Sequence, residues 1–149
     1  MRIAPLCLAA MATVATALPA RADVFGYWLN QDQDAIIEIT PCGNSACGSL
    51  VWFAEPNFEN GQPKTDLNNP DPAMTTRTVC NLQIIGDFTN DGDSKWTDGS
   101  IYDPKKGKTY KSKMHVTDEG NLYLRGYIGI SLIGRSETWT RTDGNRTGC

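Results

Sequence analysis

The chain has 149 residues, with 14 basic residues, 17 acidic residues and a single histidine, so its formal net charge is −3 at pH 7. This length suits one domain with a single core. The acidic balance and the absence of a long basic run argue against nucleic-acid binding, and one histidine restricts both metal sites and nucleophilic catalysis.

The first 22 residues have the pattern of a secretory signal peptide. A basic start, Met1-Arg2, precedes an apolar run over 3–19, and Ala20-Arg21-Ala22 fits the small-x-small cleavage pattern. We therefore expect cleavage before Asp23, export to the periplasm or out of the cell, and one mature domain over 23–149. Cleavage would leave 12 basic and 17 acidic residues, a net charge of −5. No second apolar span follows, so we expect no membrane insertion of the mature protein.

Strand signals dominate the mature chain, as short apolar or aromatic runs between turn residues. A strong hairpin signal lies at Asn90-Asp91-Gly92-Asp93, and Asp98-Gly99 indicates a bulge or tight bend inside a strand. The eight expected strands are 25–30, 35–40, 48–53, 80–88, 95–102, 109–117, 122–129 and 133–142.

Alternation is clearest over 109–117, where Tyr110, Ser112, Met114 and Val116 share one face. Lysines and His115 share the other face, which predicts a half-buried strand with a solvated outer side. Eight antiparallel strands form either a sandwich or an up-and-down barrel, whose interior holds packed side chains or one small ligand.

The proline-rich segment 54–78 interrupts this rhythm. Two interpretations are open: a lid or binding loop, and an ordered crossover with one helical turn near 72–76.

Four cysteines remain after cleavage, and an even number in an exported domain favours disulfides. We expect Cys42–Cys47, which brackets a turn sequence, and Cys80–Cys149, which would hold the C-terminus. A metal or redox site is disfavoured, because the spacing lacks a second close pair and a Cys-x-x-Cys motif.

Aromatic residues supply the candidate binding groups. Trp28 and Trp139 are expected in the core, with Gly26 and either Arg135 or Arg141 completing the closure of the barrel through a cation–π contact. Other aromatic side chains are candidates for lining a ligand cavity. These are Trp52, Trp96, Tyr102, Tyr110 and Tyr127.

Catalytic signals are weak, and we assign no catalytic residue, cofactor or metal. His115 lies on the lysine face, and Asn90–Asp93 lacks most of a calcium loop. A carboxylate pair drawn from Glu38, Asp98, Asp103 and Glu137 is the one enzymatic alternative. It stays open because spacing along the chain does not show which carboxylates lie close together in space.

Several motifs together resemble one bacterial exported family, filed as domain of unknown function two-one-four-seven. They are Gly26-x-Trp28, Cys47-Gly-Ser-Leu-Val-Trp52, Asp66-Leu-Asn-Asn-Pro70, Trp96-x-x-Gly99-x-Ile-Tyr-Asp-Pro104-x-x-Gly107-x-x-Tyr110, Leu124-Arg-Gly-Tyr127, Gly134-Arg135 and Trp139-Thr-Arg141. The resemblance implies an all-β, eight-stranded antiparallel lipocalin-like (calycin-type) barrel with one long loop, in the periplasm or outside the cell. It implies no catalytic residues, and Cys80 and Cys149 lie outside the pattern.

Three functional hypotheses follow. The first is a non-enzymatic carrier or sensor of a small, largely apolar ligand. The second is an interaction module, either a homodimer or a partner of an envelope protein, with Trp52 and Phe53 presented near the long segment. The third is a carboxylate-based hydrolase.

Overall fold

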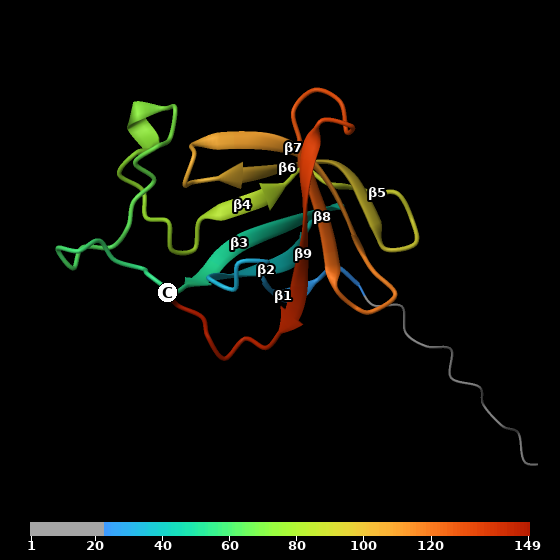
Figure 1. The fold of residues 1–149 in the computed structure, drawn as a ribbon, viewed down its shortest axis with the longest axis horizontal. Coiled ribbons are helices and arrows are strands. Elements are labelled where there is room, and N and C mark those ends of the chain that lie inside the picture. Colours follow the sequence, from blue (N-terminus) through green and yellow to red (C-terminus); the bar gives the residue numbers. More distant parts are fainter. Residues whose placement is uncertain (1–22) are drawn as a thin grey trace, which may run out of the picture.

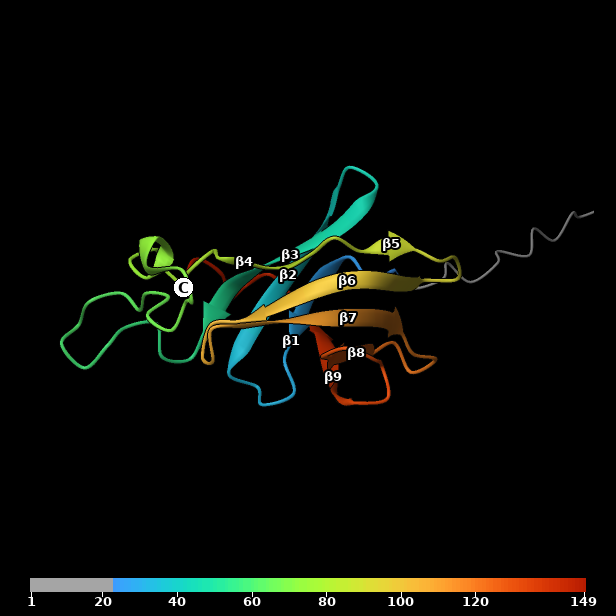
Figure 2. The ribbon, with the colours of Figure 1, turned by 90° about the horizontal axis from the view of Figure 1, so that it is seen from above.

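The computed structural model describes residues 23–149, so the signal-peptide prediction lies outside the described residues. Its strands form one antiparallel sheet in the order β4-β3-β2-β1-β9-β8-β7-β6-β5, and a further pairing of β4 with β6 closes eight of them into a barrel (Figures 1 and 2). The strands are β1 Gly26–Leu29, β2 Ala35–Cys42, β3 Ser45–Phe53, β4 Gln83–Gly86, β5 Thr89–Asn90, β6 Lys95–Asp103, β7 Lys108–Val116, β8 Leu122–Tyr127 and β9 Gly134–Thr142. The expected barrel is confirmed.

Two strands differ from their predicted limits by more than two residues. β3 begins at Ser45, three residues early, because the Cys42–Cys47 disulfide closes a tight hairpin around Gly43. The single strand expected over 80–88 is instead the short β4 and the two-residue β5, since positive φ angles at Asn81 and Asp87 interrupt the extended backbone.

Both local irregularities predicted within the second half of the sheet are present. The chain turns between β5 and β6 at Asp91–Ser94, where Gly92 has a φ of 77°. The register of β6 against β7 shifts between Trp96 and Gly99, and Asp98 has a φ of 56°, which is the geometry of a bulge. Phe88 packs against Gly99, where a side chain would collide with its ring.

The segment 54–78 is an ordered crossover between β3 and β4. It contains a 3-10 turn, η1 Pro72–Met74, and two isolated bridges, Asn57 with Pro63 and Thr65 with Thr78. Backbone bonds at 2.9–3.0 Å join Lys64 to Pro56 and Val79 to Lys64. Of the two interpretations, the ordered crossover with one helical turn is the one observed.

The last seven residues cross the outside of the barrel wall. From the end of β9 they pass Tyr27, place the Arg146 guanidinium 4.6 Å from the centre of the Trp52 ring, and reach β3, where the Cys149 N–H donates to the Val51 carbonyl at 3.1 Å. The Cys80–Cys149 disulfide holds their end. Both disulfides have the expected pairing, and we call residues 143–149 the C-terminal strap.

Candidate functional site

One end of the barrel is closed by the N-terminal segment. The Trp28 indole N–H donates to the Val24 carbonyl at 2.7 Å, and the Arg141 guanidinium lies 4.1 Å from the centre of the Trp28 ring. Arg141 also donates to the carbonyls of Phe25 at 2.9 Å and Asp23 at 2.6 Å. Gly26 has a φ of 118°, and a Cβ there would lie 3.0 Å from Arg141, so the close approach favours glycine. Arg141 therefore forms the cation–π contact that the sequence left open between two arginines.

The opposite end of the barrel is formed by the turns 30–34, 54–82, 104–107 and 128–133, and we call it the loop end. Burial along the lumen falls toward it. Most side chains of the middle lumen are almost fully buried, whereas those nearest the loop end are half-buried, as are Phe25 and Val116 at the closed end. The buried set includes Trp28, Ile37, Trp96, Met114, Leu122 and Trp139. The half-buried set is Ala35, Phe53, Ile101, Tyr110 and Glu137.

Two charged side chains share this lumen face. Leu122 pairs with Trp139, Leu124 with Glu137 and Gly126 with Arg135, and directly opposed residues point to the same side of a sheet. The Glu137 carboxylate accepts from the Trp139 indole at 2.8 Å and lies 3.8 Å from Arg135 Nε. The upper lumen therefore combines apolar side chains with a charged pair on the β9 wall.

The rim of the loop end is held by contacts between distant turns. Lys105 pairs with Asp34 at 3.0 Å, which joins the β6–β7 turn to the β1–β2 turn. Asn68 donates to the Lys105 carbonyl at 2.9 Å, and Gly107, with a φ of 63°, lies too close to Asn68 for any side chain. These contacts seat the crossover against the barrel.

A fully buried carboxylate fixes the middle of the crossover. Asp66 is 0% exposed and accepts from the Tyr102 hydroxyl at 2.6 Å, from Asn69 at 2.8 Å, and from Arg77 through Nε at 3.0 Å and Nη2 at 2.8 Å. Burial alone would raise the pKa of Asp66, but the hydrogen bonds from Tyr102, Asn69 and Arg77 and the charge of Arg77 outweigh burial and hold that pKa below its usual value. We call these four residues the Asp66 clamp.

The Asp66 clamp was missed by sequence reasoning. The motif Asp66–Pro70 was noted only as part of a family resemblance, and Tyr102 only as an aromatic. Tyr102 is 36 residues away from Asp66 along the chain, so no local spacing connects them.

The five aromatic residues predicted to line a ligand cavity do not share one face. Trp96 and Tyr110 point into the lumen, and Trp96 packs edge-on against Phe25 with ring centres 5.7 Å apart. Tyr102 belongs to the Asp66 clamp, Trp52 lies under the C-terminal strap, and Tyr127 lies on the outer face opposite Lys111.

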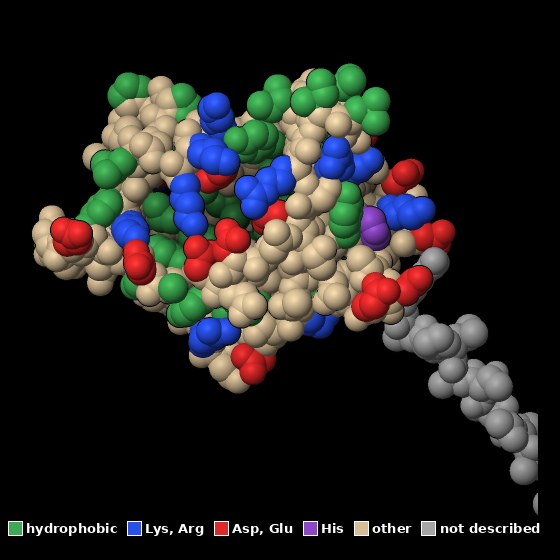
Figure 3. Space-filling model, viewed as in Figure 1, with side chains coloured by type: hydrophobic (Ala, Val, Ile, Leu, Met, Phe, Trp, Pro, Cys, Tyr) green, Lys and Arg blue, Asp and Glu red, His purple; other side chains and the backbone are tan. Residues whose placement is uncertain are grey.

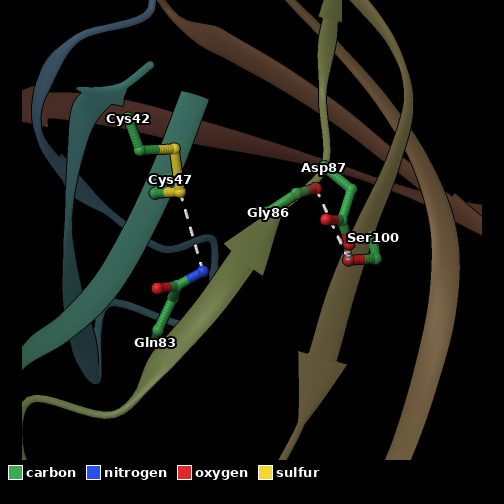
Figure 4. Close-up of a disulfide and its surroundings, with 6 residues drawn as sticks. All are labelled: Cys42, Cys47, Gln83, Gly86, Asp87 and Ser100. Carbon is green, nitrogen blue, oxygen red and sulfur yellow. Dashed lines mark hydrogen bonds between the residues drawn. A yellow bond between two sulfur atoms is a disulfide. The ribbon is translucent and has the colours of Figure 1, made fainter. Parts of the chain in front are cut away.

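A shallow pocket of about 280 Å³ lies outside the barrel, where β4 and β6 meet the crossover. Asn69, Arg77 and Tyr102 border it on the clamp side. Figure 4 shows four further lining residues, Gln83, Gly86, Asp87 and Ser100: Gln83 Nε2 reaches Cys47 Sγ at 3.6 Å, and the Ser100 hydroxyl donates to Asp87 at 2.9 Å. The polar side chains of Gln83, Asp87 and Ser100 thus already have hydrogen-bond partners within the protein.

The four carboxylates considered for a dyad have different surroundings. Glu38 lies on the outer face opposite Tyr27, Asp98 in the bulge, Asp103 beside Lys106, and Glu137 in the lumen. The geometry therefore lends no support to a carboxylate-based hydrolase.

His115 packs against Tyr123 with ring centres 4.9 Å apart, on the lysine-bearing outer face. Within residues 23–149, no group of three or more His, Cys, Asp or Glu side chains is arranged to hold a metal ion. Nor does the described part of the chain contain a helix long and apolar enough to cross a bilayer.

Comparison with known proteins agrees with this architecture. A family model described as "Uncharacterized protein conserved in bacteria (DUF2147)" matches residues 26–141. A solved structure, described as protein HP1028 from the human pathogen Helicobacter pylori and as belonging to the lipocalin family, superposes with a TM-score of 0.72 at 19% sequence identity, covering 83% of this chain and 85% of the other. No curated protein shows significant sequence similarity to the chain.

Proposed function

Because the chain belongs to the bacterial DUF2147 family and has a lipocalin-like fold, we propose that it is a non-enzymatic carrier or sensor that takes a small, largely apolar ligand into the loop end of its barrel. The observation that carries this proposal is the half-buried apolar wall of the lumen at the loop end, where no N-terminal segment covers the barrel. Ala35, Phe53, Ile101 and Tyr110 face inward without being fully covered. Half-buried apolar walls gain stability when a ligand excludes water from them.

The packing of the lower lumen limits the ligand's size. The side chains of Trp28, Trp96 and Trp139 occupy the lower and middle barrel, so the ligand is confined to the upper part. Arg135 and Glu137 provide the polar contacts there, which suits a ligand with one polar group on an apolar body.

We place this activity in the periplasm or outside the cell. Two disulfides and membership of a bacterial family fit an exported protein, because disulfides persist in oxidising compartments.

The test measures binding of the fluorescent probe 1-anilinonaphthalene-8-sulfonate, together with native mass spectrometry of the gently purified protein. Ala35→Phe fills the upper lumen, and Thr140→Phe places the same ring on the exposed outer face of β9 as a matched control. We expect Ala35→Phe to weaken probe binding about tenfold or more, since a blocked apolar site loses its buried area, and Thr140→Phe to leave it unchanged. Equal probe affinity in both variants, with no co-purified ligand, would overturn the proposal.

A further inference from the structure

The loop between β8 and β9 carries an unusual concentration of exposed aliphatic side chains. Ile128, Ile130, Leu132 and Ile133 are between 59% and 87% exposed. Figure 1 shows this loop rising beyond the barrel wall, and Figure 3 shows hydrophobic side chains gathered on it at the upper right. We call residues 128–133 the aliphatic tip. Exposed apolar clusters of this kind mark sites of interaction.

Several hydrogen bonds support the backbone of the aliphatic tip. Arg125 donates from Nε to the Ser131 carbonyl at 2.7 Å, from Nη2 to the Leu132 carbonyl at 3.3 Å, and from Nη1 to the Ser136 hydroxyl at 2.8 Å. The Ile133 N–H donates to the Ile130 carbonyl at 3.1 Å. Because the backbone carbonyls of this loop are hydrogen-bonded, its apolar side chains face outward.

Basic side chains surround the base of the tip. Lys111 is paired with Tyr127 and Lys113 with Arg125, so these three cations share the outer face below the tip. The one acidic residue in β7, β8 and β9 is Glu137, which faces the lumen. An outer face with cations and no carboxylate is notable in a chain with more acidic than basic residues.

We propose that the aliphatic tip docks the protein onto an anionic lipid surface, with Ile128, Ile130, Leu132 and Ile133 entering the headgroup region and the three cations meeting lipid phosphates. Aliphatic side chains beside basic ones are the combination that binds anionic membranes. This is surface adsorption and needs no membrane-spanning segment. It goes beyond the proposed ligand binding and does not depend on it.

A second copy of the chain fits the tip less well. A two-fold contact through the tip would bring Lys111, Lys113 and Arg125 of both copies together, because such an interface repeats the same surface on each side. Like charges facing one another oppose association.

The experiment is sedimentation with vesicles of phosphatidylcholine alone and vesicles that also contain phosphatidylglycerol. We expect binding to the anionic vesicles and weaker binding as salt rises. Leu132→Ser combined with Ile133→Ser should reduce it about tenfold or more, because two large side chains lose their apolar contacts. Lys111→Gln combined with Lys113→Gln should remove most of the preference for phosphatidylglycerol.

Leu67→Ser is the matched control for the tip. Leu67 is 60% exposed on the crossover, where two basic residues are paired with carboxylates, Lys64 with Glu55 and Arg77 with Asp66. We expect this variant and the lumen variant Ala35→Phe to bind vesicles like the wild type.

Three results would overturn the proposal: no binding to phosphatidylglycerol vesicles, equal binding by the tip variant, or an equal loss in Leu67→Ser. Light scattering at several concentrations tests the second-copy alternative. A dimer that disappears in the tip variant would assign the tip to self-association instead.

Discussion

At the scale of single residues, the closed end of the barrel depends on one stacked pair. Trp28 is completely buried beneath Arg141. Trp28→Ala should lower the free energy of unfolding by about 3–5 kcal/mol, because it leaves a large cavity. Arg141→Ala should cost about 1–2 kcal/mol through lost cation–π attraction and lost packing of its stem. Urea denaturation of the two single variants and the double variant measures both effects.

The two losses should not add, since each variant breaks the same contact. Arg135→Ala is the control, because Arg135 lies on the same strand with its side chain 67% exposed and should change stability little. Strict additivity of Trp28→Ala and Arg141→Ala would contradict the stacked arrangement.

The Asp66 clamp predicts a dependence of stability on pH. Its depressed pKa means that Asp66 contributes stability above about pH 4, the unfolded value, and that this contribution is lost as pH falls through the folded value. Asp66→Asn should lose about 2–3 kcal/mol at pH 7, because Arg77 loses its buried partner. The difference from wild type should shrink below about pH 4, which denaturation at several pH values measures.

Asp103→Asn provides the comparison for Asp66. Asp103 lies 3.7 Å from Lys106, whose side chain is 59% exposed. Removing the Asp103 charge should therefore lower the free energy of unfolding by at most about 0.5 kcal/mol. A difference between Asp66→Asn and wild type that persists undiminished in acid would show that the clamp acts through shape and not through charge.

At the scale of elements, the C-terminal strap ties β9 to β3 and to the residues before β4. The Cys80–Cys149 bridge spans 69 residues, against 5 for Cys42–Cys47, and longer closed loops restrict the unfolded chain more. Cys149→Ser should therefore lower the free energy of unfolding by about 2–4 kcal/mol, and Cys42→Ser by less. Thermal unfolding under oxidising conditions distinguishes them.

Cys149→Ser should also free the strap for proteolysis. Trypsin cleavage after Arg146 should become faster than in Cys42→Ser, because Arg146 would leave the Trp52 ring more often. Equal thermal midpoints of Cys149→Ser and wild type would contradict this account.

The elements also show how far local patterns reach. Alternation and turn chemistry predicted most strands, the β6 bulge and both disulfides, because these depend on neighbouring residues or on pairing arithmetic. The Asp66 clamp, the covering of Trp52 by Arg146 and the exposed position of the aliphatic tip depend on which turns meet in space. The sequence also placed Tyr102 and Tyr127 among the lumen candidates, although strand register directs both to the outer face.

At the scale of the whole molecule, the barrel is organised along its axis. The closed end combines a buried tryptophan, an arginine across it and an N-terminal segment beneath. The loop end combines half-buried lumen walls with long connections and the exposed aliphatic tip. With the proposed binding functions at the loop end, stability and recognition would be separated to opposite ends, as expected when binding regions come from the less stable part of a fold.

Amide hydrogen exchange should reveal this polarity. Amides of Trp28, Ile37 and Leu122 lie in paired strands of the packed core and should exchange only through global unfolding, which for a domain of this size requires about 5–15 kcal/mol. Amides over 128–133 should exchange orders of magnitude faster through local opening. A ligand in the upper lumen should slow amide exchange at Ala35 and Tyr110. The Trp28 amide should still exchange only through global unfolding. Uniform protection along the barrel axis would mean that the loop end does not open independently, and entry of a ligand there would then require a different route.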